Sequence, residues 1–521
     1  MIVAPATAEV ECLRSIVAER LGLWFDDGKL DFLAEVLQQR MEQNRCNQFA
    51  SYRELLADRT TQTKELRALA ERLTVCETYF FRYSDHFRAF EEIVVPDRME
   101  ASRQSRQLRI LSAGCASGEE AYSLAILIRE RLPALASWEV VILGIDINPT
   151  MLEAAKRGRY SAWALRGTSN GLREKYFRPD GRQFLLDGAV RPMAMFKERN
   201  LIEEDSVFWC RDAFDIIFCR NVTMYFAPEA TRAVIARLAS SLTAGGFLFL
   251  GHAETLRGIS QDFHLRHTQD SFYYQRRGDG KTCWVPVREI PGNSGFLEVS
   301  STRPALEQSD SWCEIIQRSS QRIASLTQER CSSAAAAACE RATLSANDSP
   351  VRRLIWDRTL VLDLLRKERF DEAMKVLQTL PQESNTDPDA QLLLAVLLTN
   401  GGKLAEAEKT CQRLLRLDDL SAGAHYLMAL CQEHVGDRES AKEHDRAAIY
   451  LDSSFAMPHL HIGLIAKRSA NLAEAKRELN CALQLLDRED ASRILLFGGG
   501  FTREALGQFC RAELRSCGGN S

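Results

Sequence analysis

Residues 110–126 read ILSAGCASGEEAYSLAI, and their types and spacing are those of a cofactor-binding loop. Residues 108–112 form an apolar run that predicts a strand, and residues 122–128 supply the apolar face of a helix. Between them, Gly114 and Gly118 relax the turn. A strand, a glycine-containing turn and a helix in this order are the elements that often cradle a nucleotide.

Two glutamates at the start of the predicted helix restrict which nucleotide could bind. Glu119 and Glu120 stand where a pyrophosphate would need free N–H groups and no negative charge, so a dinucleotide is disfavoured. A nucleoside that lacks phosphate and carries a cationic substituent tolerates both carboxylates, and S-adenosylmethionine (SAM) is such a ligand. Asp146 ends the next apolar run and could accept both hydroxyls of a ribose. The alternative is that the two glutamates only complement the helix macrodipole.

The composition of the whole chain narrows the class of protein. Its 521 residues predict two to four domains, and its formal net charge of −4 argues against a nucleic-acid partner held by bulk electrostatics. No apolar run approaches the roughly 20 residues that span a bilayer, and the N-terminus lacks the pattern of a secretory signal, so no membrane insertion is expected. The 15 cysteines show no zinc-type spacing, so we expect no metal site and a reducing, cytoplasmic location.

The hydrophobic pattern changes along the chain and predicts an α/β domain between two helical regions. Residues 1–75 show helical periodicity only. Within the expected domain of residues 76–277, residues 108–277 alternate amphipathic segments with the apolar runs LRILSAG, EVVILGIDIN, FDIIFCRN, GFLFLGHAE and SFYYQRR. This pattern predicts a Rossmann-like, mostly parallel sheet with helices on both faces. Residues of about 170–197 break this alternation and look like a small inserted antiparallel β-subdomain. Residues 278–350, rich in Ser, Ala and charge, are expected to form a linker.

The C-terminal region, residues 351–495, repeats every 34 residues. Three columns of mostly small residues recur with this spacing, and Gly402 and Gly436 fall in the turns between predicted helices. The period is that of the tetratricopeptide (TPR) repeat, whose helix pairs stack into a solenoid with a concave surface. Residues 496–521 are expected to supply a capping helix and a tail. The columns are Val361, Ala395, Ala429 and Gly463; Ala373, Ala407, Ala441 and Ala475; and Leu380, Leu414, Ala448 and Ala482.

Six short motifs occur in an order that resembles a known enzyme family. Together they resemble the CheR-type methyltransferases, which methylate glutamates on bacterial chemoreceptors. The resemblance covers about residues 10–277, and the attached repeats resemble the longer members of that family. It implies an N-terminal helical domain, a SAM-binding α/β domain and a small β-subdomain inserted in it. The motifs are TVCETYFFR (74–82), SAGCASGEEAYSLA (112–125), GIDIN (144–148), RNL (199–201), FCRNVTMYF (218–226) and GHAE (251–254).

The resemblance also implies roles for individual residues. Some would bind parts of SAM, and others would lie where the acceptor enters. The implied assignments are Thr78 and Arg82 near the methionine part and the reacting centre, Glu119 at the amino group, Asp146 at the ribose, Asn200 and Leu201 around the adenine, Arg220 and Asn221 at the closure of the pocket, and Tyr225 at the acceptor opening. Arg82 and Tyr225 are the implied catalytic residues.

Several of these residues have a structural alternative. Cys76 stands where the family often has Asn, which puts one amide contact to SAM in doubt. Phe80 or Phe81 is expected to belong to the core. Arg220 could instead be the partner of a structural ion pair. Tyr225 precedes a proline and a helix, so a packing role is as reasonable as a functional one.

The N-terminal helical domain is expected to cover the site and meet the acceptor protein. In the family that face tends to be basic. Residues 1–75 hold 10 Lys and Arg against 12 Asp and Glu, so any positive surface must come from local clustering, for instance around Arg40 and Arg45. The alternative is that these charges lie on solvated helix faces.

The implied reaction is methyl transfer from SAM to glutamates in the cytoplasmic domain of a methyl-accepting chemoreceptor, in a chemotaxis-like or surface-sensing pathway. The product of the cofactor is S-adenosylhomocysteine. A glutamate side chain, with a pKa of about 4.3, is already ionised at neutral pH and needs no general base, so His86 and His252 are expected to be scaffold residues. The alternatives are a small-molecule acceptor, or a catalytically weak SAM-binding scaffold that acts through its TPR array. The array would bind a protein or peptide that the sequence does not identify.

Overall fold

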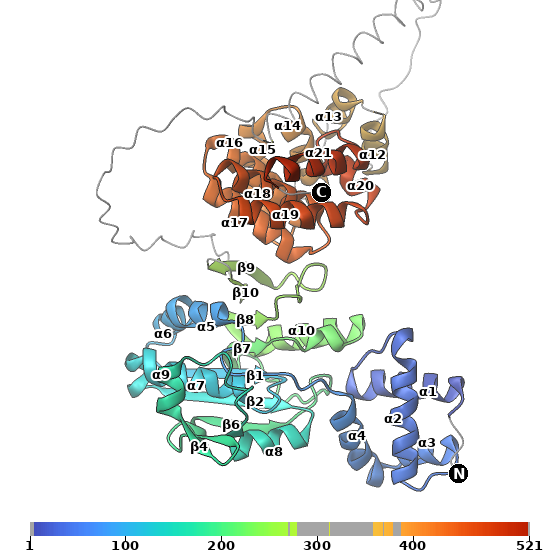
Figure 1. Cartoon of the computed structure of the whole chain (residues 1–521), viewed down its shortest axis with the longest axis vertical. Coiled ribbons are helices and arrows are strands. Elements are labelled where there is room, and N and C mark those ends of the chain that lie inside the picture. The colour runs from blue at the N-terminus through green and yellow to red at the C-terminus, as the bar shows by residue number, and fades with distance from the viewer. Residues whose placement is uncertain are drawn as a thin grey trace, which may run out of the picture. The chain divides into compact units, whose positions relative to one another are not determined.

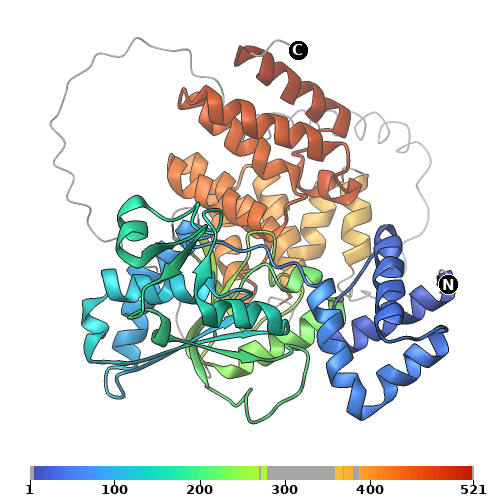
Figure 2. The same cartoon turned by 60° about the horizontal axis from the view of Figure 1, so that its bottom comes forward.

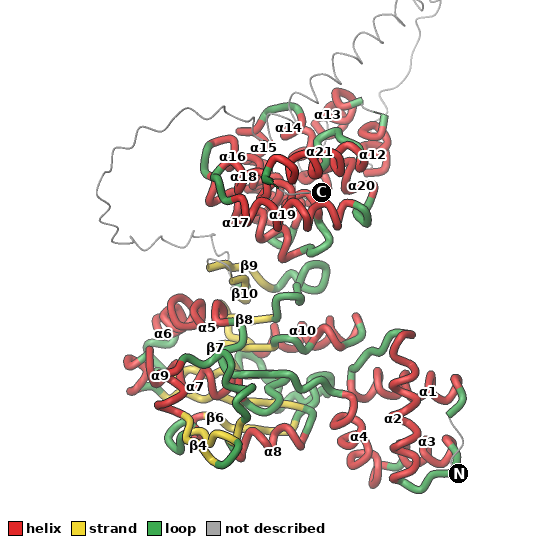
Figure 3. Tube along the Cα trace, viewed as in Figure 1, coloured by secondary structure: helices red, strands yellow, loops and turns green. Residues whose placement is uncertain are grey.

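The computed structural model describes residues 5–268, 271–278, 312, 358–367, 369–378 and 387–518. The chain divides into two compact units, Met1–Thr282 and Cys283–Ser521. The first unit contains helices and strands, whereas the described residues of the second unit contain helices only (Figure 3). Among the described residues, no helix has the length and apolar character needed to cross a membrane.

The N-terminal domain is helical, as predicted, and its described residues form a bundle of four α-helices. Its core consists of apolar side chains spaced three and four residues apart on each helix, such as Leu33, Val36 and Leu37. A buried ion pair joins two helices, because Arg40 donates to both carboxylate oxygens of Glu65 at 2.8 and 2.6 Å. The helices are α1 (Thr7–Leu21), α2 (Leu30–Gln43), α3 (Phe49–Ala57) and α4 (Arg59–Leu73) (Figure 1).

That ion pair corrects one expectation about charge. Arg40 does not supply free positive surface, since its side chain is 13% exposed and is bound to Glu65. The hydroxyl of Tyr52 also donates to Glu65, at 2.6 Å. A carboxylate that accepts three such bonds compensates the desolvation of the arginine. The charge of Arg40 therefore stabilises the packing of helices within this domain.

The central domain is built on a seven-stranded sheet with the order β6-β2-β1-β7-β8-β10-β9. Neighbouring strands are parallel from β6 to β8, and β10 is antiparallel to both β8 and β9. Every residue of the central strand β7 is buried. Because successive side chains point to opposite faces, both faces of the sheet are covered there, as predicted. The strands are β1 (Gln107–Ala113), β2 (Glu139–Asp146), β6 (Ala194–Glu198), β7 (Phe214–Cys219), β8 (Leu242–Leu250), β9 (Phe263–Thr268) and β10 (Ser271–Arg276).

Helices connect and cover these strands. Several of them contribute apolar side chains to one large core cluster. α7 and α8 contact β2 and β6, α10 contacts β8, and α5 contacts β10 (Figure 1). The helices of this domain are α5 (Ser84–Ala89), α6 (Val95–Ala101), α7 (Glu119–Arg131), α8 (Pro149–Arg157), α9 (Asn170–Tyr176) and α10 (Pro228–Ser241), with a π-helical segment, η2 (Phe90–Val94), between α5 and α6.

A second, three-stranded antiparallel sheet is present, with bounds that differ from the expected 170–197. It consists of β3 (Arg159–Tyr160), β5 (Gln183–Leu186) and β4 (Phe177–Asp180), in that order. It therefore begins earlier in the chain than expected. Residues 194–197 lie instead in β6, which pairs in parallel with β2 and forms an edge of the main sheet. The alternation of that segment, with exposed Met195 and Lys197, suits an edge strand.

The second unit has the predicted repeat of helix pairs (Figure 2). The residues of the predicted columns are buried at the contacts between helices: Ala373, Ala407, Ala441 and Ala475 are all 0% exposed. A Cβ atom on Gly463 would lie 2.8 Å from Cγ of Leu479, so that position admits no side chain. Leu380 lies outside the described residues. The helices are α12 (Arg358–Arg366), α13 (Phe370–Gln378), α14 (Pro388–Asn400), α15 (Leu404–Leu417), α16 (Ala422–Val435), α17 (Arg438–Leu451), α18 (Ala456–Arg468), α19 (Leu472–Leu486), α20 (Ala491–Phe497) and α21 (Arg503–Ser516).

Trp312, within the range expected to be a linker, belongs to the core of this second unit. Its side chain is 1% exposed and its ring stacks on Phe501 and Phe509 with centroid distances of 5.8 and 5.4 Å. The indole N–H donates to the hydroxyl of Tyr426 at 3.1 Å. The remaining residues of 279–357 lie outside the described part of the chain.

Candidate active site

Several of the predicted site residues lie at the carboxyl ends of three adjacent strands. β2, β1 and β7 are neighbours in the sheet, and they end at Asp146, Ala113 and Cys219. The loop after β1 is fixed to the end of β2, since the amides of Gly114 and Cys115 both donate to the carbonyl of Ile145 at 2.8 and 3.0 Å. In parallel sheets this edge is where ligands bind.

The two glycines of the loop are required by both conformation and space. Gly114 has φ of 72° and Gly118 has φ of 88°, which L side chains rarely adopt. A Cβ atom on Gly114 would lie 2.4 Å from Cγ2 of Val222. On Gly118 it would lie 2.9 Å from both Ala155 and Phe196. The loop therefore approaches the strand ends as closely as a bare backbone allows.

Asp146 is held in place by the cofactor loop and by its own strand end. Its Oδ2 accepts from the amide of Ala116 at 2.8 Å, and its Oδ1 accepts from the amide of Asn148 at 2.8 Å. Burial raises the pKa of the carboxyl, and the backbone hydrogen bonds oppose that effect. A carboxylate oxygen has a second lone pair, so both oxygens can still accept from the hydroxyls of a ribose.

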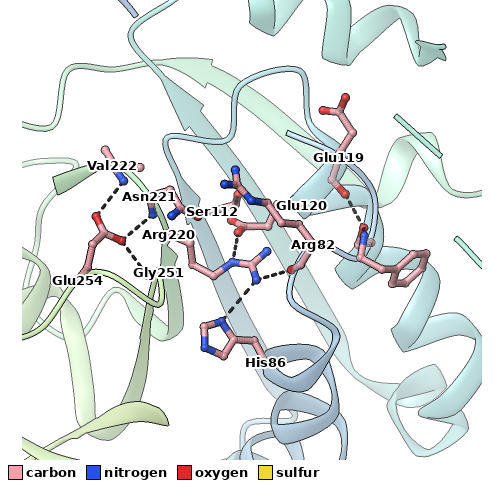
Figure 4. A network of polar contacts seen from close by, with 12 residues as sticks. Arg82, His86, Ser112, Glu119, Glu120, Arg220, Asn221, Val222, Gly251 and Glu254 are labelled. Atoms are coloured by element: carbon pink, nitrogen blue, oxygen red, sulfur yellow. Dashed lines mark hydrogen bonds and ion pairs between the residues drawn. The ribbon is translucent and has the colours of Figure 1, made fainter. Parts of the chain in front are cut away.

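Glu119 and Glu120 have different environments although they are adjacent (Figure 4). Glu119 is 3% exposed and accepts a hydrogen bond from Oγ of Ser117 at 2.7 Å. Burial raises the pKa of Glu119 to about 7. Glu120 instead accepts from Oγ of Ser112 at 2.6 Å and from Nε of Arg220 at 2.6 Å. Glu120 therefore belongs to an ion pair, whereas Glu119 remains a buried carboxylate without one among the described residues.

The contacts of Arg220 agree with the structural alternative. Its side chain is 3% exposed and pairs with Glu120. The same guanidinium donates to the carbonyl of Arg82 at 2.6 Å and lies 3.4 Å from Nδ1 of His86 (Figure 4). It thus ties the start of α7 to the segment that carries Arg82. Burial lowers the pKa of His86 well below its usual value and also lowers that of His252.

The segment between α4 and α5 carries Arg82 in a constrained backbone. Phe81 and Tyr83, on either side of Arg82, have φ of 57° and 61°. Such left-handed conformations cost about 1 kcal/mol or more for each residue and persist only where the surroundings hold them. Here the amide of Phe81 donates to Oγ of Ser123 at 3.0 Å, and the Arg82 guanidinium donates to the carbonyl of Glu77 at 2.8 Å.

Thr78 and Cys76 lie in the same segment, and both are half-buried. Oγ1 of Thr74 and Nδ2 of Asn148 each lie 3.6 Å from Sγ of Cys76. Of Phe80 and Phe81, Phe80 is the core residue. It is 0% exposed, and its ring contacts that of Tyr160 edge-on, with a centroid distance of 4.8 Å.

Asn200, Leu201 and Tyr225 lie where the helical domain meets the central domain. Nδ2 of Asn200 donates to the carbonyl of Arg20 at 2.8 Å, and Leu201 is buried. The carbonyl of Tyr225 accepts from the amide of Trp24 at 2.7 Å, and its half-buried side chain packs against the core of the helical domain. These residues join the two domains, which is a role that short motifs could not reveal.

Glu254 is a residue of the site that sequence reasoning missed. It is 5% exposed, and its two oxygens accept from the amides of Asn221 at 2.6 Å, Val222 at 3.0 Å and Gly251 at 2.7 Å (Figure 4). The hydroxyl of Thr223 donates to it as well, at 2.7 Å. Glu254 is the last residue of the motif GHAE, but from the sequence alone only His252 of that motif was given a role.

Two features of the site test whether SAM fits. Glu119 is buried and Asp146 is half-buried, and neither has an ion-pair partner among the described residues, so a cation and hydroxyl groups would suit them. Oδ1 of Asn221 is buried and has no hydrogen-bond partner, in a residue with φ of 59°. A buried acceptor without a partner is available to a donor group of a ligand. The residues present therefore fit SAM.

Comparisons with known proteins agree with this arrangement. Residues 76–272 match the model of the CheR methyltransferase SAM-binding domain, and residues 8–74 match that of the CheR methyltransferase all-alpha domain. A "Chemotaxis protein methyltransferase 2" of Vibrio cholerae is 33% identical over 271 residues, which cover 52% of this chain and 93% of that protein. The chain belongs to the CheR methyltransferase family.

Further relatives and the repeat model complete the comparison. A "Chemotaxis protein methyltransferase 1" of Pseudomonas aeruginosa is 31% identical over 279 residues, which cover 52% of this chain and 99% of that protein. Residues 364–431 of this CheR-family chain match the model of the tetratricopeptide repeat, as the 34-residue period predicted. The chain is a SAM-dependent protein-glutamate methyltransferase with a C-terminal TPR region.

Proposed function

We propose that this chain methylates glutamates in the cytoplasmic domain of a methyl-accepting chemoreceptor. The observation that carries the proposal is the pair of carboxylates Glu119 and Asp146. Glu119 is buried at the start of α7, and Asp146 is half-buried at the end of β2. Their placement suits a nucleoside with a cationic substituent, and the relatives are named as chemotaxis protein methyltransferases. The pathway would be chemotaxis-like or surface-sensing.

The residues that would hold SAM lie around the carboxyl ends of β2, β1 and β7. We assign Glu119 to the amino group and Asp146 to the ribose, on their burial and hydrogen-bonding capacity. We assign Asn221 to the cofactor through its unpartnered Oδ1. Thr78, Asn200 and Leu201 keep their assignments from the family resemblance, and Arg220 would act on the site through its contacts with Glu120 and Arg82.

The proposed reaction requires no proton transfer by residues of the chain. SAM, when bound, supplies an electrophilic methyl group. The acceptor glutamate, with an ordinary pKa of about 4.3, is ionised at neutral pH, so no residue has to remove a proton. Arg82 would orient that carboxylate, and Tyr225 would line its approach. An arginine that bound the free carboxylate too tightly would slow the reaction, because the charge is lost in the product.

The test of the cofactor site is calorimetric titration of S-adenosylhomocysteine into the full chain and its Asp146→Ala variant. We expect binding that is lost in the variant, since the ribose contact is removed. The test of the reaction is transfer of a labelled methyl group to a purified chemoreceptor cytoplasmic fragment, read as base-labile label. Binding without transfer to any fragment would favour a scaffold that acts through the TPR array. Label on a metabolite would favour a small-molecule acceptor.

Arg82 gives a sharper test of the reaction. We expect Arg82→Ala to lower turnover at least tenfold while the affinity for S-adenosylhomocysteine changes less than threefold, because Arg82 would orient the acceptor carboxylate. Arg82→Lys keeps the charge but loses the planar fork, so it should recover only part of the turnover. Equal losses of turnover and cofactor affinity in Arg82→Ala would contradict this role.

We also propose that the chain acts in the cytoplasm. The 11 cysteines among the described residues are all free thiols. Burial raises the pKa of several of them, such as Cys115 and Cys219, which keeps the thiol protonated. Buried, reduced cysteines suit a reducing compartment, which is also where the cytoplasmic domain of a receptor would be reached.

A further inference from the structure

Beside the site, aromatic rings and guanidinium groups alternate in a continuous stack. Arg166 lies over the ring of Trp163 at 4.2 Å and over that of Tyr79 at 3.7 Å. Arg82 lies over the ring of Tyr79 at 5.9 Å and over that of Tyr83 at 5.2 Å. We call these five residues, Trp163, Arg166, Tyr79, Arg82 and Tyr83, the aromatic–arginine ladder. They come from two segments that are 80 residues apart in the chain.

The two segments are fixed to each other. The amide of Phe80 donates to the carbonyl of Ala164 at 2.9 Å. A Cβ atom on Gly167 would lie 2.6 Å from the carbonyl oxygen of Phe80, so this glycine allows the close approach. The guanidinium of Arg166 also donates to the carbonyl of Trp163 at 2.9 Å. The ladder is therefore a rigid surface, and little side-chain entropy remains to be lost when a partner binds.

Trp163 forms the outer end of the aromatic–arginine ladder and is exposed to solvent. Its side chain is 68% exposed, which makes it the most exposed tryptophan among the described residues. A single exposed apolar residue is ordinary, but this one is held by a stacked arginine and continues into four further residues of the ladder. Trp, Tyr and Arg are also the residue types that dominate binding energy at protein interfaces.

The inner end of the ladder reaches the proposed reacting centre. Arg82 belongs to it, and the amide of the neighbouring Phe81 donates to Ser123 on α7. The positive charge of Arg166 partly offsets the rise that burial causes in the pKa of Glu119. A molecule that lay along the ladder would therefore have one end at the site and the other on Trp163.

We propose that the aromatic–arginine ladder is the docking surface for the acceptor segment, an acidic helix that also carries an apolar residue. This proposal rests on the proposed function. Two carboxylates of the helix would meet Arg166 and Arg82, and an aliphatic or aromatic side chain would cover Trp163. Because both guanidinium groups lie on the ring of Tyr79, at 3.7 and 5.9 Å, carboxylates one or two helical turns apart can reach them together.

The charges around the ladder favour a peptide over a nucleic acid. Glu77 lies 3.4 Å from Arg166, and Asp85 pairs with Arg88 near the inner end. The carboxylates of exposed Glu77 and half-buried Asp85 would repel a phosphate backbone that runs along the surface, and the whole chain has a formal net charge of −4. A helix with separate carboxylates can place each one on an arginine and avoid them.

The test compares Trp163→Ala and Arg166→Ala with the control Arg103→Ala in the full chain. Arg103 is an exposed arginine that precedes β1, at the opposite edge of the sheet from the site. The assay measures methyl-ester formation on a purified chemoreceptor cytoplasmic fragment at pH 8, together with calorimetric affinity for S-adenosylhomocysteine. For each ladder variant we expect the KM for the fragment to rise tenfold or more, with cofactor affinity within twofold of the parent. Trp163→Phe should recover most of the loss.

Other outcomes would overturn the proposal in distinguishable ways. An unchanged KM in both ladder variants, with active parent protein, would remove the ladder from acceptor binding and leave the proposed function standing. Equal changes in KM and cofactor affinity would show a structural effect only. Quenching of Trp163 fluorescence by a single-stranded oligonucleotide, with no effect of the receptor fragment, would assign the ladder to nucleic acid. Failure of the parent protein to methylate any fragment would refute the proposed function itself.

Discussion

At the scale of single residues, the adjacent carboxylates of Glu119 and Glu120 at the start of α7 have different partners. Glu119 and Glu120 are equivalent in the sequence, and either could complement the dipole of α7. In the structure, Glu120 is paired with Arg220, whereas Glu119 is buried beside a hydroxyl. The distinction depends on a residue 100 positions away, so no local pattern could have predicted it.

The raised pKa of Glu119 predicts a pH dependence of cofactor binding. Its pKa is about 7 because burial disfavours the carboxylate. A cationic amino group needs the ionised form, so affinity should fall as protonation increases below pH 7. From the binding equation, the dissociation constant of S-adenosylhomocysteine should rise about eightfold between pH 7.5 and pH 6. Calorimetry over this range measures it, and Glu119→Gln should bind weakly with a nearly flat profile. A steep profile in Glu119→Gln would assign the titration to another group.

The raised pKa of Glu119 also makes the stability of the folded protein depend on pH. Stability falls as the pH rises, whereas cofactor affinity increases. Because the pKa of Glu119 is raised, the folded protein without ligand holds a proton that the unfolded chain releases above about pH 4.5. Its contribution to stability is complete below that pH and is lost as the pH rises through about 7. Ligand binding offsets this loss, which links cofactor affinity to the stability of the site.

Glu254 is expected to be the residue that holds the loop after β7. Its carboxylate accepts from the amides of Asn221, Val222 and Gly251, so Glu254→Gln replaces one acceptor oxygen by a donor that faces N–H groups. We expect a loss of about 3 kcal/mol in urea unfolding of the unit Met1–Thr282, with weaker cofactor binding. Glu229→Gln, with a side chain that is 82% exposed, should change stability by less than about 0.5 kcal/mol. Similar values for both variants would contradict the role of Glu254.

At the scale of elements, the central strands were predictable and the edge strands were not. Burial on both faces gives β1, β2, β7 and β8 long apolar runs, and β10 follows the same rule. The two edge strands, β6 and β9, carry charged and polar residues such as Lys197, His264 and Arg266. Edge strands need such residues to avoid pairing with other chains, and the same residues conceal the strand in the sequence.

The cofactor loop is the element whose sequence is most constrained by space. Gly114→Ala would place a methyl group 2.4 Å from Val222 in a backbone with φ of 72°. We expect it to cost about 2 kcal/mol and to lower the affinity for S-adenosylhomocysteine at least tenfold, since the loop must move away from the strand ends. Gly171→Ala in α9 is the matched control, because a Cβ atom there meets open space. Unchanged affinity in Gly114→Ala would mean that the loop tolerates this movement.

At the scale of the whole molecule, the C-terminal repeat was easier to predict than the contacts between the helical and central domains. A 34-residue period is visible because each contact between helices demands a small or apolar residue at the same place, as at Ala407 and Ala441. The interface between the helical and central domains combines hydrogen bonds to backbone carbonyls, such as those of Arg20 and Tyr225, with side-chain contacts such as that of Arg67 with Glu198. Any residue type can supply a carbonyl, so the carbonyl contacts leave no mark in the sequence.

Trp312 shows that the second unit extends beyond the regular repeats. It is buried against Phe501 and Phe509 and donates to Tyr426, yet it lies 46 residues before α12 begins. A composition rich in Ser and Ala around it predicts a linker, and one aromatic residue does not alter that composition. The core contact could therefore be found only in three dimensions.

This contact predicts how the two units respond to one substitution. Trp312→Ala should lower the stability of the unit Cys283–Ser521 by about 3–5 kcal/mol, because it removes a large buried ring from that core. Trp312→Phe keeps a ring but loses the hydrogen bond to Tyr426, so it should cost about 1 kcal/mol for that bond. Calorimetric unfolding of the full chain measures both, and the affinity for S-adenosylhomocysteine, which belongs to the other unit, should stay within twofold. A stable second unit in Trp312→Ala would show that the array does not need this residue, and the expected linker would then extend through it.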